Sequence, residues 1–330
     1  MSDPAAWREN WTEGEGSKFA GRPAPESEAE YSTLTYEVDG RIARITFNRP
    51  HRGNAITAET PGDIAAAVER ADLDPRVHVI LLSGRGKGFC GGYDLFETAE
   101  RNFSDSEGTP STGGTVLDPA VQAANHNPFA AEPWDPMIDY AMMSRFNRGF
   151  SSLLHATKPT VAKLHGFCVA GGTDIALYCD QIICADDTKI GYPPTRVWGV
   201  PAAGMWAHRL GDQRAKRLLL TGECLAGTQA AEWGLAVESW PAEELDQRTE
   251  SLVGKIAAMP VNQLMMVKLA LNSALLAQGV QNSGMISTVF DGISRHTREG
   301  YSFQLRSAEV GFRQAVRERD EFFGDHKRSS

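Results

Sequence analysis

The sequence predicts an α/β fold in which a parallel sheet is built from strand–helix–strand units and is followed by a helical C-terminal region. Short β-rich runs alternate with helical segments up to about residue 240, the order typical of parallel sheets. Two of these runs end in glycine-rich turns, within 84–95 and 163–177, that lead directly into helices. After Pro241 the apolar residues recur at helical spacing. We therefore expect an N-terminal arm at 1–30, a core at 31–240 and a helical region at 241–330.

Each element follows from a local pattern. The first 30 residues are rich in Glu, Pro, Ala, Gly and Ser without periodicity, which predicts a mobile arm. Trp7, Trp11 and Phe19 are unusual for such an arm and could dock on the body or on a neighbouring subunit. In the core, helices are predicted at 61–71 and from Gly172. Apolar and β-branched runs predict strands at 34–38, 41–47, 77–83, 161–165 and 181–184, with a further strand just before Pro241.

Two apolar stripes define the helical region. Their members are Leu245, Val253, Ile256 and Ala257 on the first, and Leu264, Val267, Lys268, Leu271 and Leu275 on the second. Such stripes are the faces that helices bury against a core.

Composition excludes several classes of function. The chain has 33 Lys and Arg against 42 Asp and Glu, a net charge of −9, which argues against a nucleic-acid-binding surface. Local basic segments at 85–87, 209–217 and 313–319 leave a small anionic ligand possible, although such segments are more often solvated faces.

No apolar run approaches the ~18 residues of a membrane span, and the N-terminus lacks a signal peptide, so we expect a cytoplasmic protein. The five cysteines have no paired spacing and are expected to be reduced core thiols. No metal-ligand spacing, P-loop, nucleophile elbow or dinucleotide fingerprint appears in a convincing context.

The two glycine-rich turns point to chemistry at backbone amides. Where a strand breaks at glycines and restarts as a helix, the first N–H groups have no partner within the helix. One such amide from each turn would form an oxyanion hole, and Asp174, early in the second helix, could move a proton. The alternative is that the glycines serve packing alone and that Asp174 is favoured by the helix dipole.

Both segments resemble the crotonase (enoyl-CoA hydratase/isomerase) superfamily. Residues 89–95, Phe-Cys-Gly-Gly-Tyr-Asp-Leu, match its Phe-x-x-Gly-x-Asp-Leu pattern. Residues 165–174, His-Gly-Phe-Cys-Val-Ala-Gly-Gly-Thr-Asp, are similar to its second motif, in which His/Asn-Gly is followed by Gly-Gly-x-Glu/Asp. The resemblance extends over roughly 33–324. It implies a crotonase-like ββα spiral core and a C-terminal helical part used in trimerisation, giving a homotrimer or a dimer of trimers.

The same resemblance implies the site. The amides of Tyr93 and Gly171 form the oxyanion hole for an acyl-CoA thioester, and Asp174 acts as acid/base. No cofactor is needed beyond the CoA of the substrate. Residues implied in substrate and CoA binding are Arg52, Asn54, Ala55, Gly92, Tyr93 and Gly171, of which Arg52 alone offers charge.

The chain departs from the family at two places. The second glutamate of a usual hydratase falls at Pro194, so another group would have to supply a second acid. Asp135 and Asp139 are candidates, as are Tyr192 and Glu97, although residues of these types are more often ordinary surface or capping residues. His165 and His208 are given no catalytic role, and Asp94 and Asp180 are expected to be structural, the former capping a helix.

The second departure is an insertion at 101–145. Its first half is Ser/Gly/Thr/Pro-rich and predicted flexible, whereas 134–140 is apolar enough to form an ordered cap over the acyl site.

The resulting prediction is an acyl-CoA-processing enzyme of the enoyl-CoA hydratase/isomerase type, a lyase or isomerase. Two alternatives stay open: a CoA thioester or C–C bond hydrolase on the same scaffold, and a catalytically weak acyl-CoA binder that lacks the second glutamate.

Overall fold

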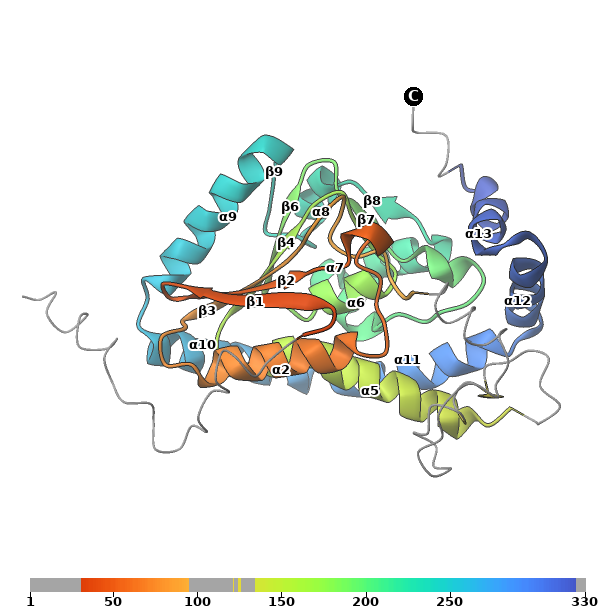
Figure 1. Cartoon of the computed structure of the whole chain (residues 1–330), viewed down its shortest axis with the longest axis horizontal. Coiled ribbons are helices and arrows are strands. Elements are labelled where there is room, and N and C mark those ends of the chain that lie inside the picture. Colours follow the sequence, from red (N-terminus) through yellow and green to blue (C-terminus); the bar gives the residue numbers. More distant parts are fainter. Residues whose placement is uncertain (1–30, 95–120, 122–123, 126–133, 325–330) are drawn as a thin grey trace, which may run out of the picture.

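The computed structural model describes residues 31–94, 121, 124–125 and 134–324. Its main sheet has six strands in the order β1-β2-β3-β4-β6-β9 (Figure 1). They are β1 (Leu34–Asp39), β2 (Ile42–Phe47), β3 (Val79–Gly84), β4 (Thr160–Leu164), β6 (Gln181–Ala185) and β9 (Glu238–Trp240). β1 and β2 form an antiparallel hairpin, and the other neighbouring pairs are parallel. The predicted α/β class and every predicted strand are therefore confirmed.

The hairpin sets which face of the sheet is buried. Asp39 pairs with Ile42, so only two residues connect the strands, and the first of them, Gly40, has φ +57°, a conformation that favours glycine. Along β2 the buried residues alternate with half-buried ones, as expected for a strand with one face in the core.

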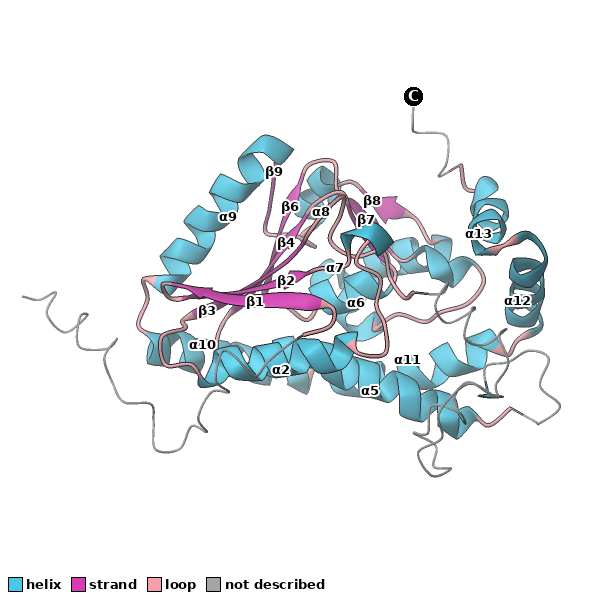
Figure 2. Ribbon diagram, viewed as in Figure 1, coloured by secondary structure: helices cyan, strands magenta, loops and turns pink. Residues whose placement is uncertain are grey.

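Helices cover both faces of the central strands (Figure 2). On one face α2 (Thr60–Leu73) and α5 (Pro136–His155) pack through Ile64, Phe150 and Leu153 into the main core. On the other face α9 (Ala242–Ala257) contributes Leu245 and Val253 to a smaller core with β3, β4 and β6. This two-sided burial explains why β3 is a continuous apolar run.

A second, three-stranded sheet was not predicted. It contains β5 (Phe167–Val169), β7 (Lys189–Gly191) and β8 (Cys224–Leu225), in the order β5-β7-β8. Strands of two or three residues are too short to show an alternating pattern. The sheet matters because β5 leads through a single residue into α6 (Gly171–Ala176), the helix of the second glycine-rich turn.

The region after β9 is helical, as predicted. Its helices after α9 are α10 (Val261–Ala277), α11 (Val280–Arg295), α12 (Arg298–Val310) and α13 (Phe312–Glu321). Before β9 the chain also forms the short helices η1 (Pro50–Arg52) and η3 (Pro193–Arg196) and the helices α7 (Ala203–Thr221) and α8 (Gly227–Trp233). α7 is broken at Gly211, whose φ is +72°.

The stripe predicted on α10 is only partly correct. Val267 and Leu271 are 48% and 67% exposed, whereas Lys268 and Leu275 are buried. The Lys268 ammonium is stable inside because it forms an ion pair with Asp180 at 2.9 Å and donates to two backbone carbonyls.

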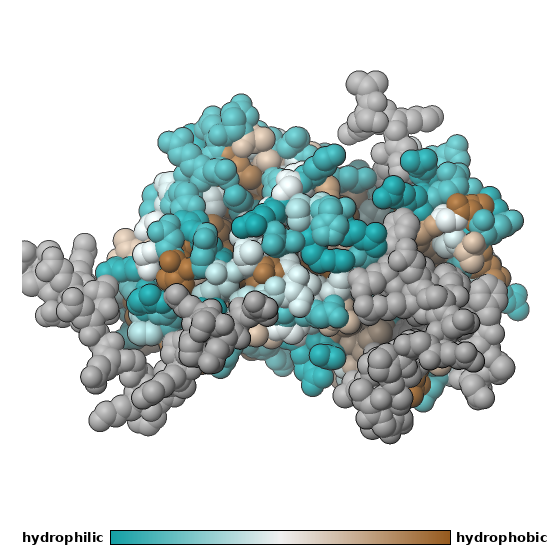
Figure 3. Space-filling view, viewed as in Figure 1, coloured by the Kyte–Doolittle hydropathy of each residue, from teal (hydrophilic) through white to brown (hydrophobic). Residues whose placement is uncertain are grey.

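Exposed apolar side chains gather on α10 and α11. The face in Figure 3 is mostly hydrophilic with scattered apolar residues, which is normal for a protein surface. By contrast, these two helices expose Met266, Val267, Leu269, Leu271, Met285, Ile286, Val289, Phe290 and Ile293 by 39–67%. Such a concentration is typical of a surface that packs against another molecule.

The cysteines are free thiols, and Cys90, Cys168, Cys179 and Cys184 are buried, as predicted, whereas Cys224 is only partly buried. Burial raises the pKa of Cys90, Cys179 and Cys184 to about 12, so these thiols stay protonated. Within the described ranges, no helix has both the length and the apolar character needed to cross a membrane. The predicted arm, Glu97 and the first half of the insertion lie outside the described residues.

Candidate active site

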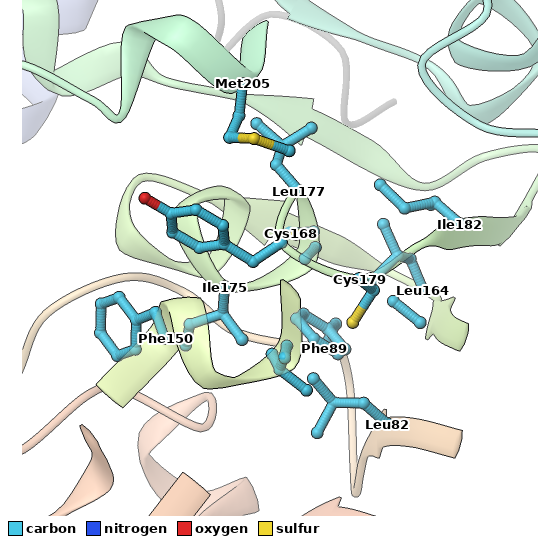
Figure 4. Packing of buried hydrophobic residues seen from close by; sticks show 14 of the residues in the cluster. Leu82, Phe89, Phe150, Leu164, Cys168, Ile175, Leu177, Cys179, Ile182 and Met205 are labelled. Carbon is cyan, nitrogen blue, oxygen red and sulfur yellow. The ribbon is translucent and has the colours of Figure 1, made fainter. Parts of the chain in front are cut away.

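The two glycine-rich turns are joined side by side. Cys90 in the first turn pairs with Cys168 of β5, and the Val169 N–H donates to the Cys90 carbonyl at 3.1 Å. His165 Nε2 lies 2.9 Å from the Gly86 carbonyl oxygen. Gly166 has φ +60°, and a Cβ there would lie 1.9 Å from the Lys87 oxygen, so the close approach requires glycine. Figure 4 shows Phe89, Cys168 and Ile175 in the tightly packed core beneath these turns.

The Tyr93 amide faces away from the strand-like segment beside it. Ile56 donates to the Gly92 carbonyl at 2.8 Å and accepts from the Asp94 N–H at 2.9 Å. In such a bridge the residue between these two groups directs its own N–H to the opposite side. Among the described residues, the Tyr93 N–H has no acceptor.

An unusual backbone conformation precedes the Gly171 amide. Ala170, just before α6, has φ +52° and ψ −132°, a conformation that is costly for a residue with a Cβ. It is held there because its N–H donates to the Gly191 carbonyl at 3.0 Å and its carbonyl accepts from Thr173. The described part of the chain offers the Gly171 N–H no acceptor.

These two amides lie close together. A Cβ on Gly92 would be 3.4 Å from the Gly171 nitrogen, and a Cβ on Gly171 would be 2.8 Å from the Tyr93 ring. Gly92, whose φ is +94° and where a Cβ would also lie 2.7 Å from Ala170 Cβ, therefore needs to be glycine for the two turns to approach. The arrangement brings together two donors from separate turns, which is what stabilisation of a developing oxyanion requires.

Asp174 lies in the first turn of α6 and is 4% exposed. Burial raises the pKa of its carboxyl group to about 8, although the Ala202 N–H, which donates to Oδ1 at 2.9 Å, acts in the opposite direction. The negative charge of Asp291 raises the pKa further. Asp174 is thus a buried carboxylic acid that carries a proton at neutral pH.

This pKa predicts a pH-dependent stability. The folded protein holds the Asp174 proton up to about pH 8, whereas an unfolded aspartate loses it near ~4, so the folded state binds more protons between these values. The contribution of Asp174 to the free energy of unfolding is therefore fully present below pH ~4 and falls by about 1.4 kcal/mol per pH unit until pH ~8. Denaturant unfolding of wild type and Asp174→Asn from pH 5 to 9 should show this slope in their difference. A constant difference would contradict the raised pKa.

Two tyrosines share the electrostatic environment of Asp174. Burial, followed by the charges of Asp174 and Asp291, raises the pKa of the Tyr93 and Tyr192 phenols well above the ordinary value. Both phenols are therefore neutral at physiological pH. Tyr192 is 3% exposed and precedes η3, the short helix that carries Pro194 where the family has glutamate.

Asp291 and Arg295 of α11 also reach this environment, and the sequence analysis did not identify them. They form an i,i+4 ion pair at 2.7 Å, and Asp291 is 5% exposed. The only signal in the sequence is this charged spacing within a helix, which most often marks a solvated face.

The insertion residues have partners outside the reacting centre. Asp135 caps α5 by accepting from the Met137 N–H at 2.8 Å. Asp139, fully buried, pairs with Arg295 at 3.0 Å and with His296 at 3.1 Å, and also accepts from Trp134. Trp134 stacks on His296. The partners of Asp139 thus lie on α11 and at its C-terminal end, and the segment before α5 packs on the end of α11.

The residues expected at the CoA site support the first turn. Asn54, with φ +54°, accepts from the Arg49 N–H and donates to the carbonyls of Arg85 and Gly88. Ala55 accepts from the Arg49 guanidinium at 2.7 Å. Arg52 pairs with Asp94 at 2.9 Å and keeps about a third of its side chain exposed.

Other polar residues have structural surroundings. Asp94 is buried and forms ion pairs with Arg49 and Arg52, and the segment that it was expected to cap lies outside the described residues. Asp180 accepts from the Thr160 N–H at 2.7 Å. His208 is exposed on α7 and contacts Gln278. In the described ranges, no group of three or more His, Cys, Asp or Glu could hold a metal ion.

Known proteins share this architecture. A crystal structure of an enoyl-CoA hydratase from Mycobacterium smegmatis has a TM-score of 0.82 and 65% identity, covering 89% of this chain and 95% of that one. An enoyl-CoA hydratase/isomerase structure from Xanthobacter autotrophicus Py2 has a TM-score of 0.72 and 26% identity, covering 88% and 98%. These confirm the predicted crotonase-like core with a helical C-terminal region.

Sequence comparison leads to the same group. A probable enoyl-CoA hydratase of Mycobacterium bovis is 27% identical over 247 residues, which is 74% of this chain and 82% of that protein. The hydroxycinnamoyl-CoA hydratase-lyase of Pseudomonas fluorescens is 27% identical over 229 residues, 68% of this chain and 72% of that protein. The profile of the enoyl-CoA hydratase/isomerase family matches residues 37–123 and 136–306, well over half of the sequence. This chain therefore belongs to the enoyl-CoA hydratase/isomerase family of the crotonase superfamily.

Proposed function

We propose that this enzyme moves a proton at the carbon next to the carbonyl of an acyl-CoA thioester, through an enolate bound by the Tyr93 and Gly171 amides. The observation that carries the proposal is the adjacency of these two N–H groups, neither with an acceptor in the described chain, beside the buried Asp174. Two such donors lower the energy of the negative charge that develops on the thioester oxygen.

Asp174 serves as the proton-transfer group. Because the pKa of Asp174 is about 8, its carboxyl group is protonated at neutral pH and has a proton to donate. A pKa this close to neutral pH also lets the resulting carboxylate take a proton back. A hydration that adds water to an enoyl-CoA needs a second group to activate the water. Tyr192 and Asp291 are polar groups that share the electrostatic environment of Asp174. Pro194 offers no acid or base.

CoA recognition is proposed at the edge formed by η1 and the first glycine-rich turn. Arg85 and Lys87 are exposed there, and a Cβ on Gly86 between them would lie 2.6 Å from Pro50 of η1. Together with Arg52 they provide the positive charge that phosphates require. No cofactor is proposed beyond the substrate's own CoA.

Assembly is proposed as a homotrimer or a dimer of trimers. The support is the exposed apolar surface of α10 and α11, which a second copy of the chain would remove from water.

The test is exchange at the carbon next to the carbonyl. Purified enzyme is incubated with saturated and unsaturated acyl-CoA thioesters in D₂O, and deuterium incorporation is followed by mass spectrometry together with double-bond absorbance and thiol release. We expect incorporation into at least one thioester, lost in Asp174→Asn. Thiol release without incorporation would favour a thioester hydrolase, and binding without either reaction would favour a weak acyl-CoA binder. Pro194→Glu is the matched gain variant and should increase hydration if the missing carboxylate limits it.

A further inference from the structure

The loop that follows η3 is held by side chains from two distant elements. It comprises residues 199–202, the last four residues of the connection between η3 and α7. Three of its residues have an N–H group, the exception being Pro201, and all three donate to side chains. The hydrogen bonds run from Gly199 to Ser294 Oγ at 2.9 Å, from Val200 to Asp291 Oδ1 at 3.0 Å and from Ala202 to Asp174 Oδ1 at 2.9 Å.

Asp291 is itself fixed on its other side. Its Oδ2 accepts from Arg295 Nη1 at 2.7 Å, and Arg295 Nη2 donates to Asp139 Oδ1 at 3.0 Å. The three charges form a chain from α5 to the loop, and both carboxylates are at least 95% buried. A buried carboxylate with a bound guanidinium and a backbone donor has little freedom to move.

We propose that Asp291 is a positioning residue for Asp174: it fixes the loop through the Val200 N–H, and the loop fixes the Asp174 carboxyl group through the Ala202 N–H. Ser294 adds a second anchor on the same helix. The reactive carboxyl of α6 is in this way aligned by α11, an element from the C-terminal region. The proposal rests on the proposed function only where it concerns turnover.

The charge of Asp291 has a separate effect. Around Asp174 lie Cys90, Tyr93, Cys168, Tyr178, Tyr192 and Asp291, from the first turn, β5, the segment after α6, the β7–η3 connection and α11. Burial raises the pKa of these thiols and phenols, so they are neutral near pH 7. The charges that act in this group are therefore Asp291 and Arg295, and loss of the Asp291 charge should make Asp174 easier to ionise.

Two variants separate the hydrogen bond from the charge. Asp291→Ala removes the acceptor, whereas Asp291→Asn keeps an oxygen for the Val200 N–H and removes the charge. Asp74→Asn is the matched control, because Asp74 is also 5% exposed, accepts a backbone N–H at 2.9 Å and pairs with Arg76 at 2.7 Å, at the end of α2.

The protonation of Asp174 is read directly from the infrared carbonyl band of its neutral acid, as the difference from the same protein with Asp174→Asn. We expect Asp291→Asn to move the titration of this band to lower pH. Asp291→Ala should lower kcat by about 10- to 100-fold with little change in KM, as expected when a reacting group is misaligned. Asp74→Asn should leave both the band and kcat unchanged.

Two outcomes would overturn the positioning role: an Asp174 band that titrates identically in Asp291→Ala and Asp291→Asn, or wild-type kcat in a folded Asp291→Ala protein. An unshifted band in Asp291→Asn would contradict only the separate effect of the charge. The infrared titration needs no substrate. A band that differs between the two variants, in an enzyme that turns over no acyl-CoA, would therefore support the role of Asp291 and count against the proposed function alone.

Discussion

Replacing Asp174 with asparagine is expected to lower turnover of an accepted acyl-CoA by about 10²–10⁴-fold, the usual cost of losing a general acid or base. Asparagine has the same shape and keeps an oxygen for the Ala202 N–H, so the loop should stay in place and acyl-CoA affinity should change little. In the wild-type enzyme the donating form of Asp174 disappears above pH 8, and the rate of the proton-donating step should decline there. Steady-state kinetics from pH 6 to 9.5 measures both effects.

Asp74→Asn again provides the control for a buried carboxylate, and we expect its kcat to stay near wild type. If Asp174→Asn retained full turnover on a substrate that shows deuterium incorporation, Asp174 would have no part in the mechanism. A loss confined to KM would instead indicate a binding role.

Replacing Gly171 with proline is expected to lower kcat by about 10²–10³-fold, the typical cost of removing one oxyanion-hole donor. Proline has no N–H and is well tolerated at the first position of a helix, which Gly171 occupies in α6, so the helix should still form. The measurement is kcat on the best thioester, together with the binding constant of a saturated acyl-CoA.

Gly171→Ala separates the lost donor from added bulk. A Cβ at this position would lie 2.7 Å from Ile56 Cδ1 and 2.8 Å from Tyr93 Cε2, both of which are ends of side chains that can shift. Alanine keeps the N–H, so its loss of activity should be much smaller than that of proline. Equal losses in the two variants would mean that crowding, rather than hydrogen bonding, explains the effect.

Much of the fold could be predicted because its signals are local. Five of the six strands of the main sheet are runs of five or six residues with clear β propensity, and the sixth, β9, lies directly before Pro241. α6 begins where a strand breaks at glycines. The second sheet could not be found this way, because its strands are only two or three residues long. The exposure of Val267 and Leu271 was also missed, since helical spacing shows which residues share a face but not what covers that face.

The residues of the candidate site also differ in how far they could be predicted from the sequence. Tyr93, Gly171 and Asp174 belong to contiguous motifs, so their neighbourhood was open to prediction from the sequence. Asp291 comes from a helix more than a hundred residues further along, and only tertiary packing brings it to the loop after η3. The conformation of Ala170 was equally inaccessible, because alanine rarely adopts a positive φ and nothing in the local sequence signals it.

Helix α11 has one consequence for how this enzyme can be engineered. The same four turns present Ile286, Val289 and Phe290 to the outside and Asp291, Ser294 and Arg295 to the interior. A substitution made on the outer side to improve solubility therefore falls on the helix whose inner side holds the loop next to Asp174. Variants of α11 that improve solubility should accordingly be assayed for turnover as well.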